Sequence, residues 1–195
     1  MNRHKQTLRR QFLQQRQALA PAVWQMQSDR ICHHLANCHQ FVEAQTILAY
    51  QSCRQEPNLH SLFKATDKQW GLSRCVGKDL RWHRWQPSEL LVTGEYGILE
   101  PSAELPTLAA SNVDLILVPA VAIDFNNYRL GYGGGYYDRL RADADWRKIP
   151  TIGIVFDFAY VESLPIEPWD LPLDAVCTEL GFDRPQLGNS IIWHC

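Results

Sequence analysis

Short apolar runs, separated by longer amphipathic or polar segments, form the main pattern of this chain. Four of the runs lack polar alternation, and this predicts strands that are buried on both faces of a sheet. These runs are residues 46–50, 114–118, 151–155 and 175–178. Residues 72–76 and 80–85 predict two further strands.

Helical periodicity occupies the segments between several of these strands. Helices are predicted at residues 3–19, from Pro21 onward, from about 57 to 64, and from 137 to about 143. Strands that alternate with helices predict an α/β fold in which a largely parallel sheet lies between two helical layers. We therefore expect a single domain of three-layer α/β/α architecture over residues 1–195.

Composition narrows the range of partners. The 195 residues carry a net charge of -2, which gives no general attraction to nucleic acid or to an anionic membrane. No apolar run approaches the roughly 18 residues of a membrane span, and the N-terminal segment lacks the apolar core of a signal peptide. The six cysteines fit free thiols in a reducing compartment. We expect a cytoplasmic monomer that binds neither nucleic acid nor membrane.

A glycine-rich segment, RLGYGGGYYDR, occupies residues 129–139. It follows the strand at 114–118 and leads into the helix from 137. Glycine lets the backbone approach a ligand closely, and N–H groups at a helix start attract anions. The segment has neither the GxxxxGK[ST] pattern of a P-loop nor the complete GxGxxG pattern, since Tyr136 takes the last glycine position. The combination nevertheless predicts a phosphate site.

Other segments of the chain suggest where this site lies. Ligands of parallel sheets bind beyond the carboxyl ends of the strands, where the loops at 51–56, 119–137 and 156–170 should meet. The irregular connection at 87–106 is long enough to suggest a binding loop. Lys5, Arg9 and Arg16 lie along the edge of the first helix, and the pattern alone favours cations that merely border its apolar stripe.

Residues 114–138 resemble the signature of the 5-formyltetrahydrofolate cyclo-ligase family, whose members are also called methenyltetrahydrofolate synthetases. The resemblance extends over nearly the whole chain, in the order 5–9, 50–56, 96–101, 153–156 and 162–176. It implies an enzyme that uses ATP and Mg²⁺ to convert 5-formyltetrahydrofolate into 5,10-methenyltetrahydrofolate, giving ADP and phosphate. In this chemistry the formyl oxygen attacks the γ-phosphate, the nitrogen at position 10 closes the ring, and phosphate leaves.

The resemblance also assigns the nucleotide site. It replaces the first interpretation of Lys5 and Arg9, which become ATP contacts, whereas Arg16 is expected at the surface. Arg129 and Tyr136 are assigned catalytic roles. The remaining ATP contacts are expected from Leu130, Gly131, Tyr132, Gly133, Gly134, Gly135 and Tyr137.

Folate is expected at Gln51 and Glu56 and along Tyr132 to Tyr136, because a carboxylate can accept hydrogen bonds from a pterin ring N–H and its amine together. Alternatively, Glu56 has only a structural role, because acidic residues are favoured at a helix start and Glu56 precedes Pro57. Mg²⁺ prefers carboxylate oxygens beside phosphate, and the matching positions are Asp138 and Asp170.

Both metal positions have structural alternatives. Asp138 could simply favour the start of its helix, and Asp170 could cap a loop. Asp124 and Asp174 are weaker candidates for Mg²⁺, and Asp174 could instead hold the loop before the last strand.

The chain departs from the family pattern at two places. Tyr132 stands where the family often has arginine, and Glu56 is followed by proline. A non-catalytic protein that binds folate or nucleotide is therefore the main alternative, and a thiamine-linked or nucleic-acid-associated relative is a third. The tail after about residue 184 is expected to be accessory.

Overall fold

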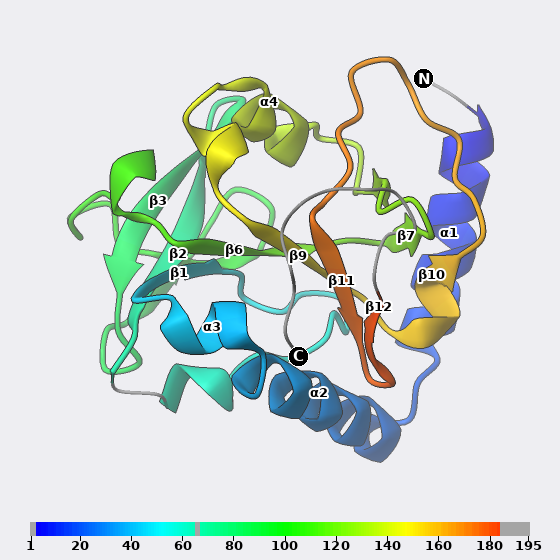
Figure 1. Ribbon diagram of the computed structural model, residues 1–195, viewed down its shortest axis with the longest axis horizontal. Helices are drawn as coiled ribbons and strands as arrows, with labels where there is room; N and C mark the ends of the chain where they lie inside the picture. The colour runs from blue at the N-terminus through cyan, green and yellow to red at the C-terminus, as the bar shows by residue number, and fades with distance from the viewer. Residues whose placement is uncertain (1–2, 65–66, 184–195) are drawn as a thin grey trace.

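A computed structural model of the chain describes residues 3–64 and 67–183. Within them, seven strands form the main sheet in the order β12-β11-β9-β6-β1-β2-β3 (Figure 1). Their bounds are β1 Thr46–Ala49, β2 Gln69–Val76, β3 Asp79–Trp85, β6 Leu115–Pro119, β9 Thr151–Ile154, β11 Ala175–Thr178 and β12 Gly181–Asp183. All six strands predicted from the sequence are present, and β12 is an addition.

The five central strands of this sheet pair in parallel, and only the edge strands β12 and β3 run antiparallel. The four predicted apolar runs are buried throughout their length as strands, except for Pro119 at the end of β6. Ile47 and Ala49 pack in one hydrophobic cluster and Leu48 in the other, so β1 is covered on both faces. The prediction of a largely parallel sheet in a single α/β domain is confirmed.

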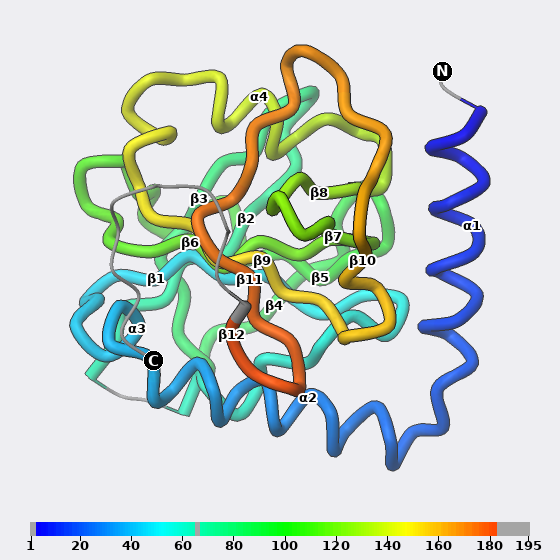
Figure 2. The backbone as a smooth tube through the Cα atoms, turned by 45° about the vertical axis from the view of Figure 1, so that its right-hand side comes forward, coloured from blue at the N-terminus to red at the C-terminus, as the bar shows by residue number. Residues whose placement is uncertain are grey.

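Helices cover each face of the sheet. On one face lie α2 (Pro21–Ala36) and α3 (His39–Glu43), whose residues Ile31, Leu35 and Phe41 join the first cluster. The other face carries α1 (Arg3–Gln17) and α4 (Tyr136–Ala142), through Phe12 and Leu140 of the second cluster. Figure 2 shows α1 and α2 as two long helices that meet at an angle beside the sheet. None of the described helices combines the length and apolar character needed to cross a membrane.

Smaller elements complete the second layer. β10 (Tyr160–Val161), β7 (Ala122–Asp124) and β8 (Arg129–Leu130) form a three-stranded sheet next to α1 (Figure 1). Four 3-10 helices lie in the connections: η1 Leu62–Lys64, η2 Ala110–Asn112, η3 Trp146–Lys148 and η4 Asp157–Ala159.

Two predictions for the connections were wrong. The segment 57–64 is helical only at η1, because the Asn58 side chain accepts a hydrogen bond from the His60 amide at 3.0 Å and forms a local turn that competes with a helix. The segment 87–106 is not wholly irregular, since β4 (Leu91–Thr93) and β5 (Leu99–Pro101) pair as a hairpin.

The topology places a binding crevice at one point of the sheet. β1 and β6 are neighbours, but the chain leaves β1 toward β2 on one side and leaves β6 toward β9 on the other. Such a switch point opens a crevice beyond the carboxyl ends of the two strands. The loops that follow β1 and β6 are the polar segment 50–56 and the segment 120–135, which contains the glycine-rich loop.

Candidate active site

The glycine-rich loop, defined here as residues 129–135, joins β8 to α4. Its backbone has φ values of +103° at Gly133 and +67° at Gly135, where glycine avoids the strain of a side chain. A Cβ on Gly131 would lie 2.5 Å from an Nη of Arg129, so the arginine packs closely across the loop. The chain then enters α4, a helix of seven residues.

The amides of the glycine-rich loop are available to a ligand. Among the described residues, none accepts a hydrogen bond from the backbone amides of residues 131–135. Tyr132, Gly133 and Gly134 are exposed, whereas Leu130 is buried. Buried or partly buried amides need acceptors, so this run of donors suits an anion or ordered water.

Three cations surround this loop. Arg9 donates from Nε to the Gly131 carbonyl at 2.7 Å, and Arg129 pairs with Asp138 at 2.6 Å. Lys5 pairs with Asp170 at 2.8 Å, in a contact where both side chains are largely buried. The structure therefore brings together all five charged residues that were predicted for ATP and Mg²⁺.

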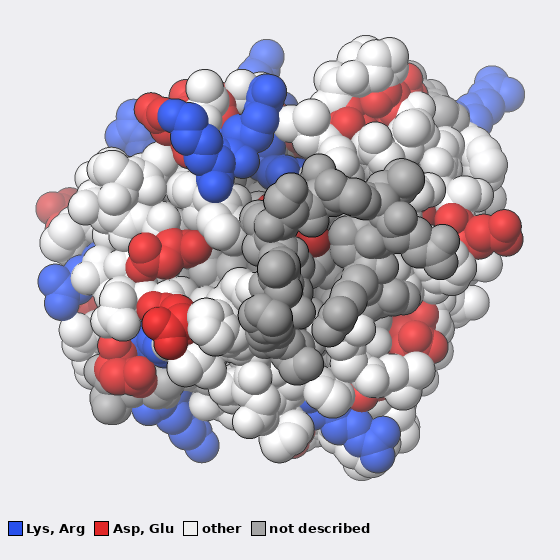
Figure 3. All heavy atoms as spheres, in the orientation of Figure 1, with Lys and Arg blue, Asp and Glu red and all other residues white. Residues whose placement is uncertain are grey.

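The charge of Arg9 interacts with both carboxylates. Burial lowers the pKa of Arg9 below its ordinary value, while the charges of Asp138 and Asp170 raise it. Figure 3 shows Lys and Arg side chains gathered where Figure 1 places α4, whereas other charges of both signs are scattered over this face. Positive charge is thus concentrated locally on this face, in a chain whose net charge is -2.

The two carboxylates fit Mg²⁺ as partial ligands. Their ion pairs use Oδ1 of Asp138 and Oδ2 of Asp170, so each carboxylate has a second oxygen beyond its ion pair. Within the described parts of the chain, no three acidic, histidine or cysteine side chains form a metal cluster. This donor set suits a cation held mainly by phosphate oxygens and water, which is the usual habit of Mg²⁺.

Glu56 contacts Tyr132 of the glycine-rich loop and is 2 % exposed. Its Oε1 accepts from the Tyr132 hydroxyl at 2.8 Å, and its Oε2 accepts from the Cys53 amide at 3.1 Å. Burial raises the pKa of Glu56, and the charge of Arg16 together with these hydrogen bonds opposes that rise. The structure thus joins two residues that were predicted for folate.

Arg16 corrects the sequence analysis, which placed it at the surface. It is 3 % exposed, and its guanidinium donates to the Arg54 and Ala120 carbonyls at 3.0 and 3.1 Å and to the Tyr132 hydroxyl. Burial of an arginine is tolerated because these acceptors satisfy its donors. One signal was available, since Arg16 follows the apolar Phe12 by four residues and so shares its helix face.

The tyrosines of the loop differ in their surroundings. The Tyr136 hydroxyl lies 2.8 Å from that of Tyr96 and donates to the Gly77 carbonyl at 3.1 Å, while the Tyr137 ring lies under the Arg129 guanidinium at 5.1 Å. The hydrogen bond with Tyr96 raises the pKa of Tyr136, which keeps its phenol protonated. Its catalytic role stays a prediction, as does the folate contact of Gln51, a half-buried residue just after β1.

The weaker metal candidates have structural partners. Asp124 accepts the Asn126 and Tyr128 amides at 3.0 Å through Oδ1 and the Leu164 amide at 3.1 Å through Oδ2. Asp174 accepts the Thr151 amide at 2.9 Å and the Thr151 hydroxyl at 2.6 Å. These contacts hold the segment before the last parallel strand, which is the role that the sequence analysis gave for Asp174 as an alternative to binding Mg²⁺.

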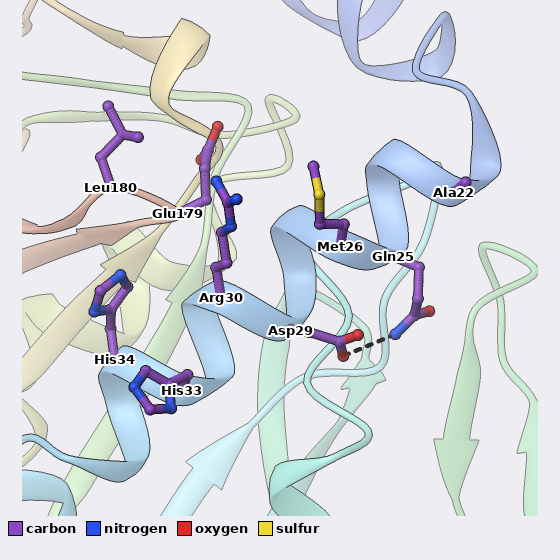
Figure 4. Close-up of a pocket in the computed structure, with 9 residues that line it drawn as sticks. All are labelled: Ala22, Gln25, Met26, Asp29, Arg30, His33, His34, Glu179 and Leu180. Carbon is purple, nitrogen blue, oxygen red and sulfur yellow. Dashed lines mark hydrogen bonds between the residues drawn. The ribbon is translucent and has the colours of Figure 1, made fainter.

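A shallow hollow of about 870 Å³ lies elsewhere, along α2 and the end of β11. Figure 4 shows His33, His34 and Arg30 of α2 on the same side as Glu179 and Leu180. No residue predicted for ATP, folate or Mg²⁺ lines it. The tail after residue 184 lies outside the described residues.

Sequence comparison identifies the family of the chain. Residues 1–179 match the model of the 5-formyltetrahydrofolate cyclo-ligase family. The chain belongs to this family. A 5-formyltetrahydrofolate cyclo-ligase of Escherichia coli K12 is 31% identical over 172 residues, which cover 85% of this chain and 94% of that protein. One from Mycolicibacterium smegmatis is 29% identical over 187 residues, covering 90% and 94%.

Solved structures of the cyclo-ligase family give the same result. The 5,10-methenyltetrahydrofolate synthetase of Aquifex aeolicus has a TM-score of 0.84 and 31% identity, and the match covers 96% of this chain and 95% of that one. The synthetase of Mycoplasma pneumoniae shares the fold, with a TM-score of 0.73 at 24% identity over 90% and 98% of the two chains. The prediction that the chain is an enzyme of this family is confirmed.

Proposed function

We propose that this protein uses ATP and Mg²⁺ to convert 5-formyltetrahydrofolate into 5,10-methenyltetrahydrofolate, with release of ADP and phosphate. One observation carries the proposal beyond family membership. The five amides of residues 131–135 have no backbone partner in the described structure and lie among Lys5, Arg9 and Arg129. Amides and cations in this arrangement suit a polyphosphate.

The reaction then needs positioning and neutralisation of charge more than covalent help from the protein. The formyl oxygen of the folate bonds to the γ-phosphorus of ATP, and ADP leaves. The nitrogen at position 10 next bonds to the former formyl carbon and loses its proton, and phosphate departs with the formyl oxygen. Arg129 stabilises the transferring phosphoryl group, and Tyr136 orients the acceptor oxygen as a protonated phenol.

Mg²⁺ would be held by Asp138 and Asp170 together with phosphate oxygens and water, and when bound it neutralises phosphate charge. The ion pairs of these carboxylates with Arg129 and Lys5 position their oxygens beside the loop. Each lysine or arginine can transfer its contact from carboxylate to phosphate, since both are anionic oxygens.

Folate lies on the other side of the loop, where Glu56 receives the N–H groups of the pterin and Gln51 lies close by. This division places ATP toward the N-terminal half of α1, which carries Lys5 and Arg9, and folate toward the segment 50–56, with residues 132–136 between them. The predicted setting is the cytoplasm, with the protein acting as a monomer on small molecules. A non-catalytic binding protein of the same fold is the alternative.

The test is to incubate the purified protein with 5-formyltetrahydrofolate, ATP and Mg²⁺ and to follow the absorbance of methenyltetrahydrofolate. We expect product only when all three are present, with one ADP formed for each methenyl product. Binding of both ligands without an absorbance change would instead support the non-catalytic alternative.

A further inference from the structure

Arg16 joins three chain segments that meet at the proposed folate site. From the last turn of α1 it donates to the Arg54 carbonyl of the segment 50–56, to the Ala120 carbonyl just after β6, and to the Tyr132 hydroxyl of the glycine-rich loop. The first two contacts are 3.0 and 3.1 Å long. No part of the proposed chemistry uses this arginine, although it is buried and charged.

Tyr132 stands between Arg16 and Glu56. Its hydroxyl accepts from Arg16 and donates to Oε1 of Glu56 at 2.8 Å, and the Arg16 guanidinium lies 5.7 Å from the centre of its ring. The positive charge of Arg16 thus reaches the carboxylate through one phenol. Because a phenol can accept and donate at the same time, this chain of hydrogen bonds has a fixed direction.

The backbone before Glu56 is strained. Arg54 and Gln55 have φ values of 47° and 56°, in the left-handed region that residues with side chains rarely adopt. Such conformations persist only where the surroundings impose them, and they cluster at functional sites. Arg16 helps to impose this one, since its side chain holds the Arg54 carbonyl. The Gln55 amide group, oriented as a donor, bonds to the Arg16 and Gln17 carbonyls at 2.6 and 3.2 Å.

We infer that Arg16 and Tyr132 are positioning residues for folate: together they fix the orientation of the Glu56 carboxylate that meets the pterin. The inference rests on the proposed function, adds Arg16 to it, and gives the Tyr132 hydroxyl a specific role. Oε1 is held by Tyr132 and Oε2 by the Cys53 amide, so the plane of the carboxylate is set while each oxygen keeps capacity for one more donor. A pterin N–H and amine need two such acceptors in one plane.

The same contacts favour the charged form of the carboxylate, in which both oxygens accept hydrogen bonds. Glu56 is buried, and burial favours its neutral form, which the charge of Arg16 opposes. Burial also raises the pKa of Tyr132, so the phenol keeps the proton that it donates. On the ATP side, Lys5 and Arg9 contact Asp170 and Gly131, and the proposed phosphate contact of Tyr132 is its backbone amide, which a change of its side chain keeps.

The decisive variant is Tyr132→Phe, which removes one hydroxyl and keeps the ring of a residue that is 37 % exposed. Because Arg16 and Glu56 each lose a hydrogen-bond partner, the Tm of this variant is measured beside that of the wild type. We expect the KM for 5-formyltetrahydrofolate to rise about tenfold, since a hydrogen bond to a charged group is lost. The KM for ATP should stay within about twofold. Tyr128→Phe, which removes the hydroxyl of a half-buried tyrosine four residues earlier, should change neither constant.

Arg16→Met provides the second arm, with Arg10→Met on the exposed side of α1 as its matched control. Because Arg16 acts through Tyr132, we expect the double variant to raise the folate KM no further than Arg16→Met alone, and Arg16→Lys to restore part of the loss. If the two residues contributed independently, the rise in folate KM of the double variant would be the product of the rises in the two single variants, which would contradict the proposed coupling.

A direct titration of each protein with 5-formyltetrahydrofolate, in the absence of ATP, makes the test independent of turnover. Weaker folate binding by Tyr132→Phe supports the inference, even if the wild type forms no product and the proposed function fails. An active wild type whose folate KM and affinity are unchanged in Tyr132→Phe overturns the inference and leaves the proposed function standing. An equal rise in the KM for both substrates also overturns it.

Discussion

Lys5→Met should separate ATP binding from folate binding. The substitution removes the ammonium group and keeps most of the apolar side chain, so the packing of α1 changes little. In the structure this group lies 2.8 Å from Oδ2 of Asp170, and only 15% and 13% of the two side chains are exposed. The substitution therefore removes a cation from the proposed phosphate site and leaves a largely buried carboxylate without its partner.

This geometry gives the expected size of two effects, on the KM for ATP and on the stability of the fold. A hydrogen bond between a charged group and phosphate contributes about 1.5–3 kcal/mol, which corresponds to a rise of roughly 10- to 150-fold in the KM for ATP. Asp170 still accepts the Glu167 amide at 2.8 Å, so its loss of Lys5 should lower the free energy of unfolding by only about 1–2 kcal/mol. For a domain of this size that is a fall in Tm of roughly 2–8 °C.

Initial rates of methenyltetrahydrofolate formation measure the first effect, with ATP varied at saturating folate and folate varied at saturating ATP. Thermal unfolding measures the second. Lys148→Met is the matched control, because Lys148 forms an exposed ion pair with Asp145 outside the site. In Lys5→Met/Asp170→Asn, the stability should recover because no unpaired carboxylate remains, whereas the KM for ATP should stay high.

A KM for ATP within threefold of the wild type would remove Lys5 from the nucleotide site. An equal rise in the KM for folate would show that Lys5 supports both substrates, and the division of the site between them would then be wrong. If the double variant recovered both stability and the KM for ATP, Lys5 would act only by pairing Asp170.

Three further outcomes follow from the carboxylates. Asp138→Asn should raise the Mg²⁺ concentration for half-maximal rate by about tenfold or more, whereas Asp145→Asn should not, and equal titrations would exclude Asp138 as a ligand. Asp174→Ala leaves the buried Thr151 amide and hydroxyl without their acceptor, so the Tm should fall by roughly 5–15 °C while both KM values stay unchanged. A change in KM without this fall in Tm would contradict the structural role of Asp174. Burial raises the pKa of Glu56 in the folded state above its ordinary value of 4.5, so the folded state holds this proton more tightly than the unfolded state does. The wild type should therefore lose stability relative to Glu56→Gln as the pH rises from about 4 toward neutrality. A difference in Tm between the two proteins that stays constant or changes in the opposite direction would refute this.

The fold was predictable where one kind of interaction decides local structure. The runs at 46–50 and 151–155 are apolar at nearly every position, so only burial on both faces satisfies them. The segment after Pro57 was not predictable in the same way. Its helical tendency competes with a turn made by the Asn58 side chain, and the energy difference between the two conformations is small.

The proximity of the residues proposed for ATP was predictable, because the glycines, Arg129 and Asp138 lie within a short stretch of the chain. The network beneath Glu56 was not, because it depends on contacts between residues far apart in sequence. The Arg16 guanidinium meets carbonyls 38 and 104 residues away, and nothing in the helical pattern specifies these acceptors.

Local rules fail at several neighbouring positions here, and their failure is informative. An arginine is buried, two residues with side chains adopt left-handed backbone, and a glutamate is removed from solvent, all within one connected network. Each feature opposes folding on its own, so a chain selected for stability alone would have no reason to combine them. Their shared result is a carboxylate held in one orientation at the switch point of the sheet, which is what the proposed contact with a pterin requires.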